Sequence, residues 1–306
     1  MVDPRMLRQG IRVVPENHSS PPEKRSIISN WSIEATLPKP EEVRVLGQLA
    51  GPDKEVFLST LPHVSLDRQI ETARIVRAAG LDPVPHIAVR YFSGRSDLSA
   101  YLGRIVGEGN VSRCLVIAGD IEKPRGEFDS AAQLIESGLL SEHGIRRVGI
   151  AGYPEGHPKI PSGSLDQALA DKLDAARRVG IEVEVVTQFC FSAEPIVSWL
   201  AGFHERWPDV PVRIGLAGPT TVKALLGYAM RCGVKAPRGG LAHKLSMAKN
   251  LVQTVAPDGI IRDIDASPTR NSVDPKLSAH FFSFGGLERT ARWAIDAYEK
   301  EAHPPN

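Results

Sequence analysis

Eight polar side chains stand at or just after the ends of short apolar runs, where parallel strands present side chains to a ligand. They are Glu34, Thr60, His86, Asp120, Tyr153, Glu155, His157 and Gln188. Carboxylates and imidazoles at such ends can exchange protons with a substrate, and hydroxyl and amide groups can orient it. Because six successive runs each carry at least one of them, we expect these side chains to share one site.

The apolar runs that would position this site alternate with amphipathic stretches, a rhythm typical of parallel βα units. The predicted strands are Trp31–Thr36, Val56–Thr60, Pro83–Val89, Arg113–Ala118, Arg147–Gly152, Val183–Gln188, Val212–Leu216 and Ala279–Phe284. Three helical stripes are formed by Leu165, Leu169, Leu173 and Ala176 before Gly180, by Ile196, Leu200, Phe203 and Trp207 after Ser192, and by Leu287, Ala291, Ala294 and Tyr298.

Eight such units predict a (β/α)8 TIM barrel, and a doubly wound open sheet is the alternative. Residues 1–30 carry Pro4, Pro15, Pro21 and Pro22 and are predicted to form an irregular N-terminal arm. The catalytic barrel is then expected over residues 31–306. Residues 236–276 are interpreted as an insertion before the last strand, because Pro and Gly are frequent there and the strand-like Ile260–Ile264 does not fit the alternation.

Composition excludes several classes of protein. The 306 residues hold 37 Lys and Arg against 36 Asp and Glu, and a net charge of +1 gives no field to bind nucleic acid. The three cysteines form no C-x-x-C pair, so neither a disulfide framework nor a zinc site is indicated. No run reaches the roughly 20 apolar residues of a membrane span, and no signal peptide is seen, so we expect a cytoplasmic chain without a membrane partner. The sequence does not decide whether the chain forms a homo-oligomer.

Several nucleotide and hydrolase motifs are absent from the sequence. It contains no G-x-x-x-x-G-K-[ST] loop, no H-E-x-x-H, no G-x-S-x-G and no G-x-G-x-x-G after a strand. A dinucleotide would therefore be held by barrel loops, with Lys172 and Arg177 reaching its pyrophosphate. The alternative is that these two cations are surface charges, since charged helix faces are common.

Four segments give the chain a family resemblance. In their order and spacing they resemble methylenetetrahydrofolate reductases, and the chain looks like a short member that holds only the catalytic domain. The segments are Ser32-Ile33-Glu34, Ala118-Gly119-Asp120, Tyr153-Pro154-Glu155-Gly156-His157-Pro158 and Thr187-Gln188-Phe189.

This resemblance implies an FAD-binding barrel that interconverts 5,10-methylenetetrahydrofolate and 5-methyltetrahydrofolate by hydride transfer. Glu34 would then donate the proton at the nitrogen that leaves during ring opening, and a water-poor barrel floor is expected to raise its pKa. Asp120 would lie between folate and flavin, although it could instead cap the next helix. By the same resemblance Gln188 contacts folate, and Phe191 packs near the substrate.

The resemblance also assigns the flavin contacts to loop residues. A neutral histidine at these positions can donate to ribose or phosphate oxygens, although His86 could equally be a core histidine. The implied contacts are Thr60, His86, Ile117, Ala118, Gly119, Asp120, Ala131, Ala151, Tyr153 and His157, together with Lys172 and Arg177.

One departure from the family leaves the electron donor open. Val222 stands near the place of a family phenylalanine that stacks folate and nicotinamide, so NADH or NADPH could bind weakly or another donor could reduce the flavin. Two other functions remain as alternatives. One is a barrel lyase or aldolase, which needs a lysine at a strand end. The other is a non-catalytic protein that binds flavin or folate.

Overall fold

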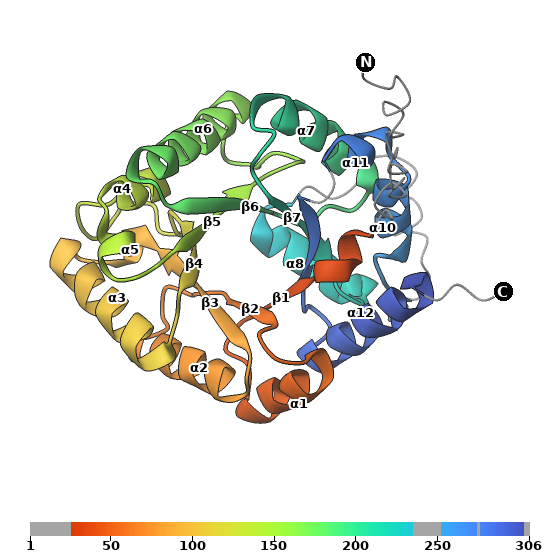
Figure 1. Cartoon of the computed structure of the whole chain (residues 1–306), viewed down its shortest axis with the longest axis horizontal. Coiled ribbons are helices and arrows are strands. Elements are labelled where there is room, and N and C mark those ends of the chain that lie inside the picture. The colour runs from red at the N-terminus through yellow and green to blue at the C-terminus, as the bar shows by residue number, and fades with distance from the viewer. Residues whose placement is uncertain (1–25, 235–251, 274–275, 303–306) are drawn as a thin grey trace, which may run out of the picture.

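Eight parallel strands close into a barrel in the computed structural model, which describes residues 26–234, 252–273 and 276–302 (Figure 1). The ring runs β1-β10-β7-β6-β5-β4-β3-β2. Its strands are β1 (Ser32–Ala35), β2 (Glu55–Leu58), β3 (Asp82–Ala88), β4 (Arg113–Ile117), β5 (Arg147–Gly152), β6 (Glu182–Thr187), β7 (Val212–Ala217) and β10 (Leu277–Phe282). All eight predicted strands are confirmed, and closure excludes the open-sheet alternative.

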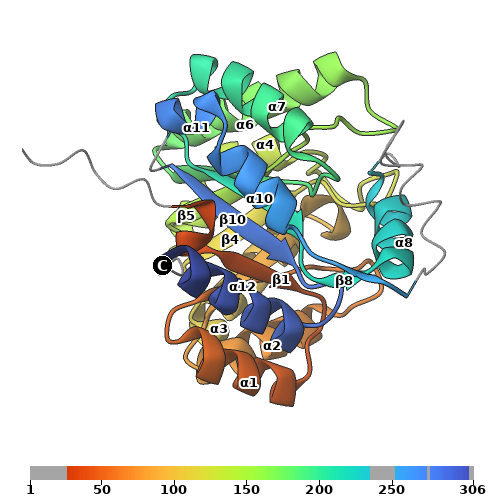
Figure 2. The ribbon, with the colours of Figure 1, turned by 90° about the vertical axis from the view of Figure 1, so that its right-hand side faces the viewer.

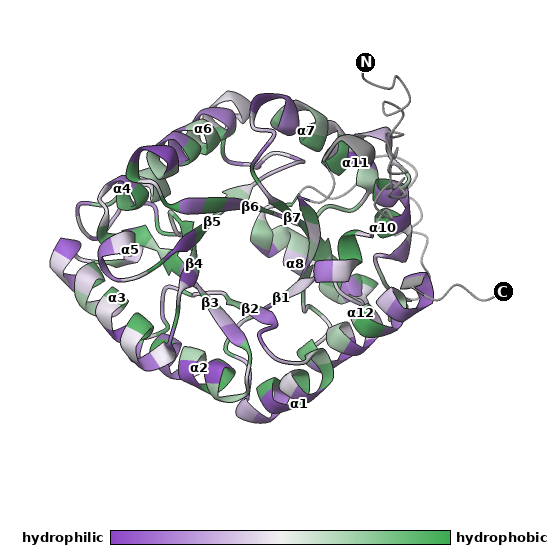
Figure 3. Cartoon of the chain, viewed as in Figure 1, coloured by the Kyte–Doolittle hydropathy of each residue, from purple (hydrophilic) through white to green (hydrophobic). Residues whose placement is uncertain are grey.

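Helices form a layer around the barrel and turn their hydrophilic sides outward (Figure 3). They are α1 (Pro40–Ala50), α2 (Leu66–Ala78), α3 (Arg95–Gly109), α4 (Ala131–Glu136), α5 (Leu139–Glu142), α6 (Ser162–Val179), α7 (Ala193–Arg206), α10 (Asp258–Asp265), α11 (Pro268–Val273) and α12 (Leu287–Ala302), with two short 3-10 turns, η1 (Ile27–Asn30) and η2 (Val89–Tyr91). The predicted stripe of α6 is buried at Leu169, Leu173 and Ala176, and Gly180 ends the helix with φ +70°. Periodicity thus identified the faces that pack on the strands.

The segment between β7 and β10 divides into two parts. Helix α8 (Val222–Cys232) follows the short strand β8 (Thr220–Thr221), which pairs with β9 (Thr254–Val255), and it lies over one end of the barrel (Figure 2). Helices α10 and α11 lie in the outer layer beside α7. The strand-like interpretation of Ile260–Ile264 is wrong, because these residues lie in α10. Residues 236–251 of the predicted insertion lie outside the described residues.

The end of the predicted arm belongs to the core. Residues 1–25 lie outside the described residues, but Ile27 and Ile28 of η1 are fully buried. Asp265 of α10 accepts a hydrogen bond from Ser26 Oγ at 2.5 Å, which ties this turn to the helix layer. The hydrophobic core therefore begins a few residues before β1.

A charged layer forms the floor of the barrel at the amino ends of the strands. Arg213 lies 2.9 Å from Glu184 Oε2 and 2.5 Å from Glu55 Oε2, and all three side chains are largely buried. Above this layer Phe57 packs edge-on against His280, with ring centroids 4.6 Å apart. The floor thus supports His280 from below. Within the described residues, no helix is both long and apolar enough to cross a bilayer.

Candidate functional site

The predicted site residues gather at the carboxyl ends of the barrel strands, the end over which α8 lies (Figure 2). Glu34 lies on β1 and His86 on β3. Asp120 and Gln188 follow β4 and β6. Burial raises the pKa of Cys232 most, and the charges of Glu34 and Asp120 add to this, so that the pKa is about 11. Both carboxylates therefore lie close to the last residue of α8.

Glu34 is held by two imidazoles inside the barrel. Its Oε2 lies 3.4 Å from His280 Nε2 and 3.3 Å from His86 Nε2, the latter without hydrogen-bond geometry. The other ring nitrogen of His280 lies 2.9 Å from Ser32 Oγ. His280 is fully buried, and the Glu34 side chain is 15% exposed. A chain of hydrogen-bonding groups thus runs from Ser32 through His280 to the carboxylate.

The predicted protonation of Glu34 is wrong for the chain alone. Burial by itself raises the pKa of this carboxyl group, but the charge of His86 and the hydrogen bond and charge of His280 outweigh it and lower the pKa to about 2. Burial conversely lowers the pKa of His280, against the charge of Glu34. The apolar strand alone predicts a raised pKa, and only the fold brings the two imidazoles to Glu34. Glu34 is therefore ionised in the chain alone.

Asp120 lies in a turn fixed by Tyr91. The backbone N–H of Asp120 donates to Tyr91 Oη at 3.3 Å. Gly119 has φ +101°, and a Cβ there would lie 2.8 Å from Tyr91 Cε1, so only glycine fits this turn. The carboxylate of Asp120 is free to act on a ligand, because the next helix is capped by Ser130 instead. The helix-capping alternative is therefore excluded.

Gln188 borders an aromatic cluster beneath α8. Its Oε1 accepts a hydrogen bond from the N–H of Phe189 at 3.0 Å. Phe191, which was predicted near the substrate, packs edge-on against Phe189, with centroids 5.9 Å apart. Tyr228 of α8 stacks on Phe284 at 4.0 Å. Aromatic rings thus cover the β6, β7 and β10 side of the barrel mouth.

Half of the twelve residues predicted to contact flavin line a narrow cavity of about 200 Å³, which we call the α4–α6 slot. It opens between the ends of β4 and β5 and helices α4 and α6. Six predicted contacts line it, namely Ile117, Ala118, Ala131, Ala151, Tyr153 and Lys172. The three alanines leave room for a flat group between the strands and the helices.

Only one of the two predicted cations of α6 reaches this slot. Lys172 donates to the carbonyl of Ala151 at 3.1 Å, and burial lowers its pKa to about 8. Arg177 is 74% exposed in the last turn of α6 and lies near Asp174. Because α6 runs away from the carboxyl ends of the strands, Arg177 points to solvent far from the slot. Arg177 does not line the slot, and its exposure fits the surface-charge alternative.

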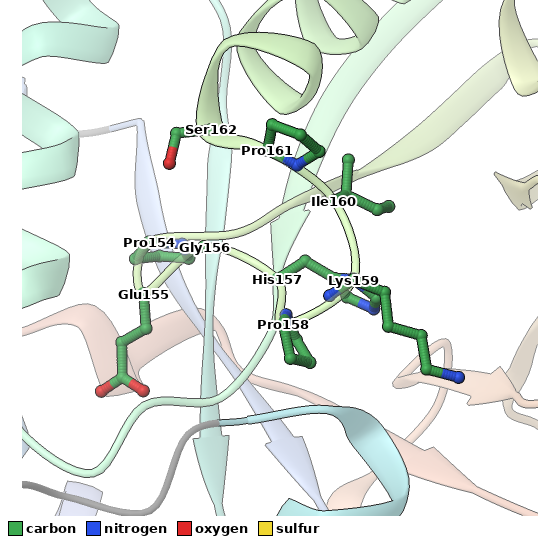
Figure 4. A pocket seen from close by; sticks show the side chains of 9 residues that line it. All are labelled: Pro154, Glu155, Gly156, His157, Pro158, Lys159, Ile160, Pro161 and Ser162. Atoms are coloured by element: carbon green, nitrogen blue, oxygen red, sulfur yellow. The ribbon is translucent and has the colours of Figure 1, made fainter.

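The loop after β5 carries Glu155, His157 and Lys159 (Figure 4). It borders an open cavity of about 580 Å³, and Glu155 and Lys159 extend from different sides of it. Glu155 Oε1 accepts from the backbone N–H of Phe191 at 3.4 Å, which joins this loop to the one after β6. Burial and Lys159 lower the pKa of His157, while Asp120 opposes this. His157 therefore lies near Asp120, as predicted.

The site has features that suit a flavin nucleotide. Thr60 Oγ1 and His86 Nε2 are buried and have no hydrogen-bond partner among the described residues, so each can bond to a ligand. The α4–α6 slot offers apolar walls with the ammonium group of Lys172 at its side. The polar barrel mouth can hold a polar ring system, and the apolar slot beside it can hold a separate flat base. In the described part of the chain, no group of three His, Cys, Asp or Glu side chains could hold a metal ion.

The slot also contains residues that the sequence did not mark as site residues, among them Asp166 and Trp199. Asp166 comes from α6, and its position six residues before Lys172 was the only available signal. Trp199 comes from α7, and its spacing placed it beside the predicted stripe of that helix. No local pattern could show that it reaches a cavity between α4 and α6.

Comparison with known proteins identifies the family of the chain. The family model described as methylenetetrahydrofolate reductase matches residues 67–266, about two thirds of the chain. The chain belongs to the methylenetetrahydrofolate reductase family. It is 27% identical over 190 residues to 5,10-methylenetetrahydrofolate reductase of Pectobacterium carotovorum subsp. carotovorum, a match that covers 60% of this chain and 61% of that protein.

A second family relative is "Methylenetetrahydrofolate reductase 2" of Saccharomyces cerevisiae (strain ATCC 204508 / S288c), 28% identical over 117 residues. That match covers 37% of this chain and 18% of the yeast protein. The chain thus spans less than two thirds of the length of both relatives. Among solved structures, 2,3-dimethylmalate lyase matches 92% of this chain and 84% of its own with a TM-score of 0.50 and 11% identity, which shows the shared fold alone.

Proposed function

We propose that this chain is a flavin-dependent oxidoreductase that interconverts 5,10-methylenetetrahydrofolate and 5-methyltetrahydrofolate. Family membership supports the reaction class. The observation that carries the proposal is that Glu34 of β1 and Asp120 after β4 both lie at the carboxyl ends of the strands of one closed barrel. A proton-transfer group and a folate-binding carboxylate would then lie on either side of one substrate.

Glu34 is the proposed point of proton transfer. Ring opening toward the methyl form needs a proton at the departing nitrogen. Because the pKa of Glu34 is about 2 in the chain alone, its proton must come from His86 or His280, whose Nε2 atoms lie within 3.4 Å of Oε2. A ligand that fills the mouth would remove the remaining exposure of Glu34 and raise its pKa. Substrate binding thus favours movement of the proton onto the carboxyl group.

Asp120 and Gln188 are the proposed folate-binding side chains. A carboxylate that makes no helix cap can accept paired hydrogen bonds from an amino-pyrimidine edge. Gln188 uses its Oε1 for the N–H of Phe189, so its amide N–H groups stay available to a folate oxygen or ring nitrogen. Phe191 and Phe189 supply an apolar border to this part of the mouth.

FAD, when bound, supplies the site that accepts and returns hydride. We propose that Thr60, His86 and the Gly119–Asp120 backbone hold its ring system, and that Lys172 and the α4–α6 slot hold its other end. His157 would donate to the ribose or phosphate oxygens between them. The unpartnered hydroxyl of Thr60 supports this assignment.

An anaerobic absorbance titration tests the proposal. The purified chain is reconstituted with FAD, and the oxidised-flavin band is followed after addition of 5-methyltetrahydrofolate. We expect the band to bleach, and a parallel run with NADH and with NADPH identifies the electron donor. Glu34→Gln should keep FAD and lose folate turnover. As a control, Glu288→Gln changes an exposed carboxylate on α12 and should leave both unchanged.

Two results would reject the proposal. One is a chain that binds no FAD, and the other is bound FAD that 5-methyltetrahydrofolate never bleaches. Borohydride treatment in the presence of substrate then separates the remaining alternatives, because a lyase that uses a lysine imine becomes covalently labelled. A protein that only binds its ligands is not labelled.

A further inference from the structure

The indole of Trp199 closes the α4–α6 slot from the neighbouring helix α7. The same residue also borders a groove on the outer surface between α6 and α7, together with Phe203 and Trp207. The slot and the groove share Asp166, Leu169 and Trp199. Trp199 is therefore the aromatic wall between an inner cavity and the protein surface.

Trp199 is held in place by its neighbours before any ligand binds. Its ring stacks on Phe203 with centroids 4.8 Å apart and an interplanar angle of 16°. It also packs closely over Gly152 at the end of β5, where a Cβ would lie 3.2 Å from Trp199 Cζ2 and 2.8 Å from Val185 Cγ1. Such a preformed wall costs a ligand little conformational entropy.

The slot favours a flat heteroaromatic ring. The small side chains of Ala131, Ala151 and Ala168 make its walls apolar. The ionisable side chains of Asp166 and Lys172 lie at its borders. A volume of about 200 Å³ is smaller than the 300–1,000 Å³ usual for a whole drug-sized ligand, so it receives only part of one. A purine with a ribose attached meets these conditions, since its faces are apolar and its edges are polar.

We propose that Trp199 is a binding residue for the adenine base of the cofactor, which packs against the indole inside the α4–α6 slot. This inference rests on the proposed function, because it takes FAD as the cofactor. Aromatic rings pack favourably with centroids 4.5–7 Å apart, and stacking of a base on an aromatic side chain is strong enough for a measurable loss on truncation. Trp199 would thereby favour FAD over FMN, which lacks the adenosine.

Binding of ADP to the cofactor-free chain tests the proposal without turnover. Intrinsic tryptophan fluorescence and calorimetry are measured for wild type, Trp199→Phe, Trp199→Ala and Trp207→Ala. The last is a matched control, because Trp207 also packs on Phe203 but does not line the slot. We expect ADP to quench wild type, Trp199→Phe to keep affinity and lose most of the quench, and Trp199→Ala to bind about tenfold more weakly.

Three results would overturn the inference: wild type that binds no ADP, Trp199→Ala with unchanged affinity, or Trp207→Ala with an equal loss. FMN, which lacks adenosine, serves as a second probe and should bind wild type and Trp199→Ala alike. The proposed function fails separately. If 5-methyltetrahydrofolate bleaches bound FAD while Trp199→Ala keeps full ADP affinity, the reductase stands and the role of Trp199 falls. If ADP binds as expected but the flavin never bleaches, the role of Trp199 stands and the proposed reductase activity falls.

Discussion

Replacing Glu34 by glutamine is expected to make the folded chain less sensitive to acid. In wild type the imidazoles of His86 and His280 lower the pKa of Glu34 from 4.5 to about 2. Between these two pH values the unfolded chain binds a proton that the folded chain rejects. The stabilisation is therefore fully present above about pH 4.5 and is lost as the pH falls toward 2. Glutamine has no such proton to bind.

The size of this effect follows from the pKa. A drop from 4.5 to about 2 corresponds to about 3 kcal/mol of stability in full, and about 2 kcal/mol of it is lost by pH 3. Because burial also lowers the pKa of His280 below 6.5, wild type and variant both lose stability as the pH falls below that value. Only wild type loses the additional stability that Glu34 contributes as the pH falls below 4.5.

Urea unfolding of the ligand-free chain at several pH values between 7 and 3 measures the difference. We expect wild type to lose about 2 kcal/mol more than Glu34→Gln between pH 5 and pH 3. Glu288→Gln, at a side chain that is 52% exposed on α12, should follow wild type throughout. If wild type and Glu34→Gln lose equal free energy over this range, the imidazoles do not hold Glu34 ionised, and the proposed source of the proton must be abandoned.

Three further variants test other parts of the site. Because burial lowers the pKa of Lys172 to about 8, its charge is lost as the pH rises past 8. FAD affinity measured by dialysis should therefore fall between pH 7 and pH 9 in wild type but not in Lys172→Arg. The control variant Arg177→Ala changes an exposed side chain and should match wild type. Gly119→Ala forces a side chain into φ +101° and against Tyr91, and thermal unfolding should show a loss of about 1–3 kcal/mol. Asp120→Asn should slow folate-dependent flavin reduction in stopped flow while leaving unfolding unchanged; an unaltered rate would remove Asp120 from the site.

Hydrophobic spacing was sufficient to predict the fold. The β-branched runs of the strands and the Leu169–Leu173–Ala176 stripe of α6 are local patterns, and burial of one face of each element leaves few ways to assemble eight βα units. Ile260–Ile264 shows where this reasoning fails. A short apolar run fits a strand or a helix equally well, and packing of α10 in the outer layer decided for the helix.

The location of the site was likewise readable from the sequence, because polar residues at the carboxyl ends of parallel strands must meet at one end of a barrel. Its electrostatics were not. Glu34 and His280 are 246 residues apart, and closure of β10 beside β1 brings this imidazole to the carboxylate. Together with His86 of β3, it reverses the direction of the pKa shift of Glu34. Trp199 reaches the α4–α6 slot for the same kind of reason, since α7 lies beside α6 only in the folded chain. Sequence thus determined which groups are present at the mouth, and tertiary contacts decided their protonation and their partners.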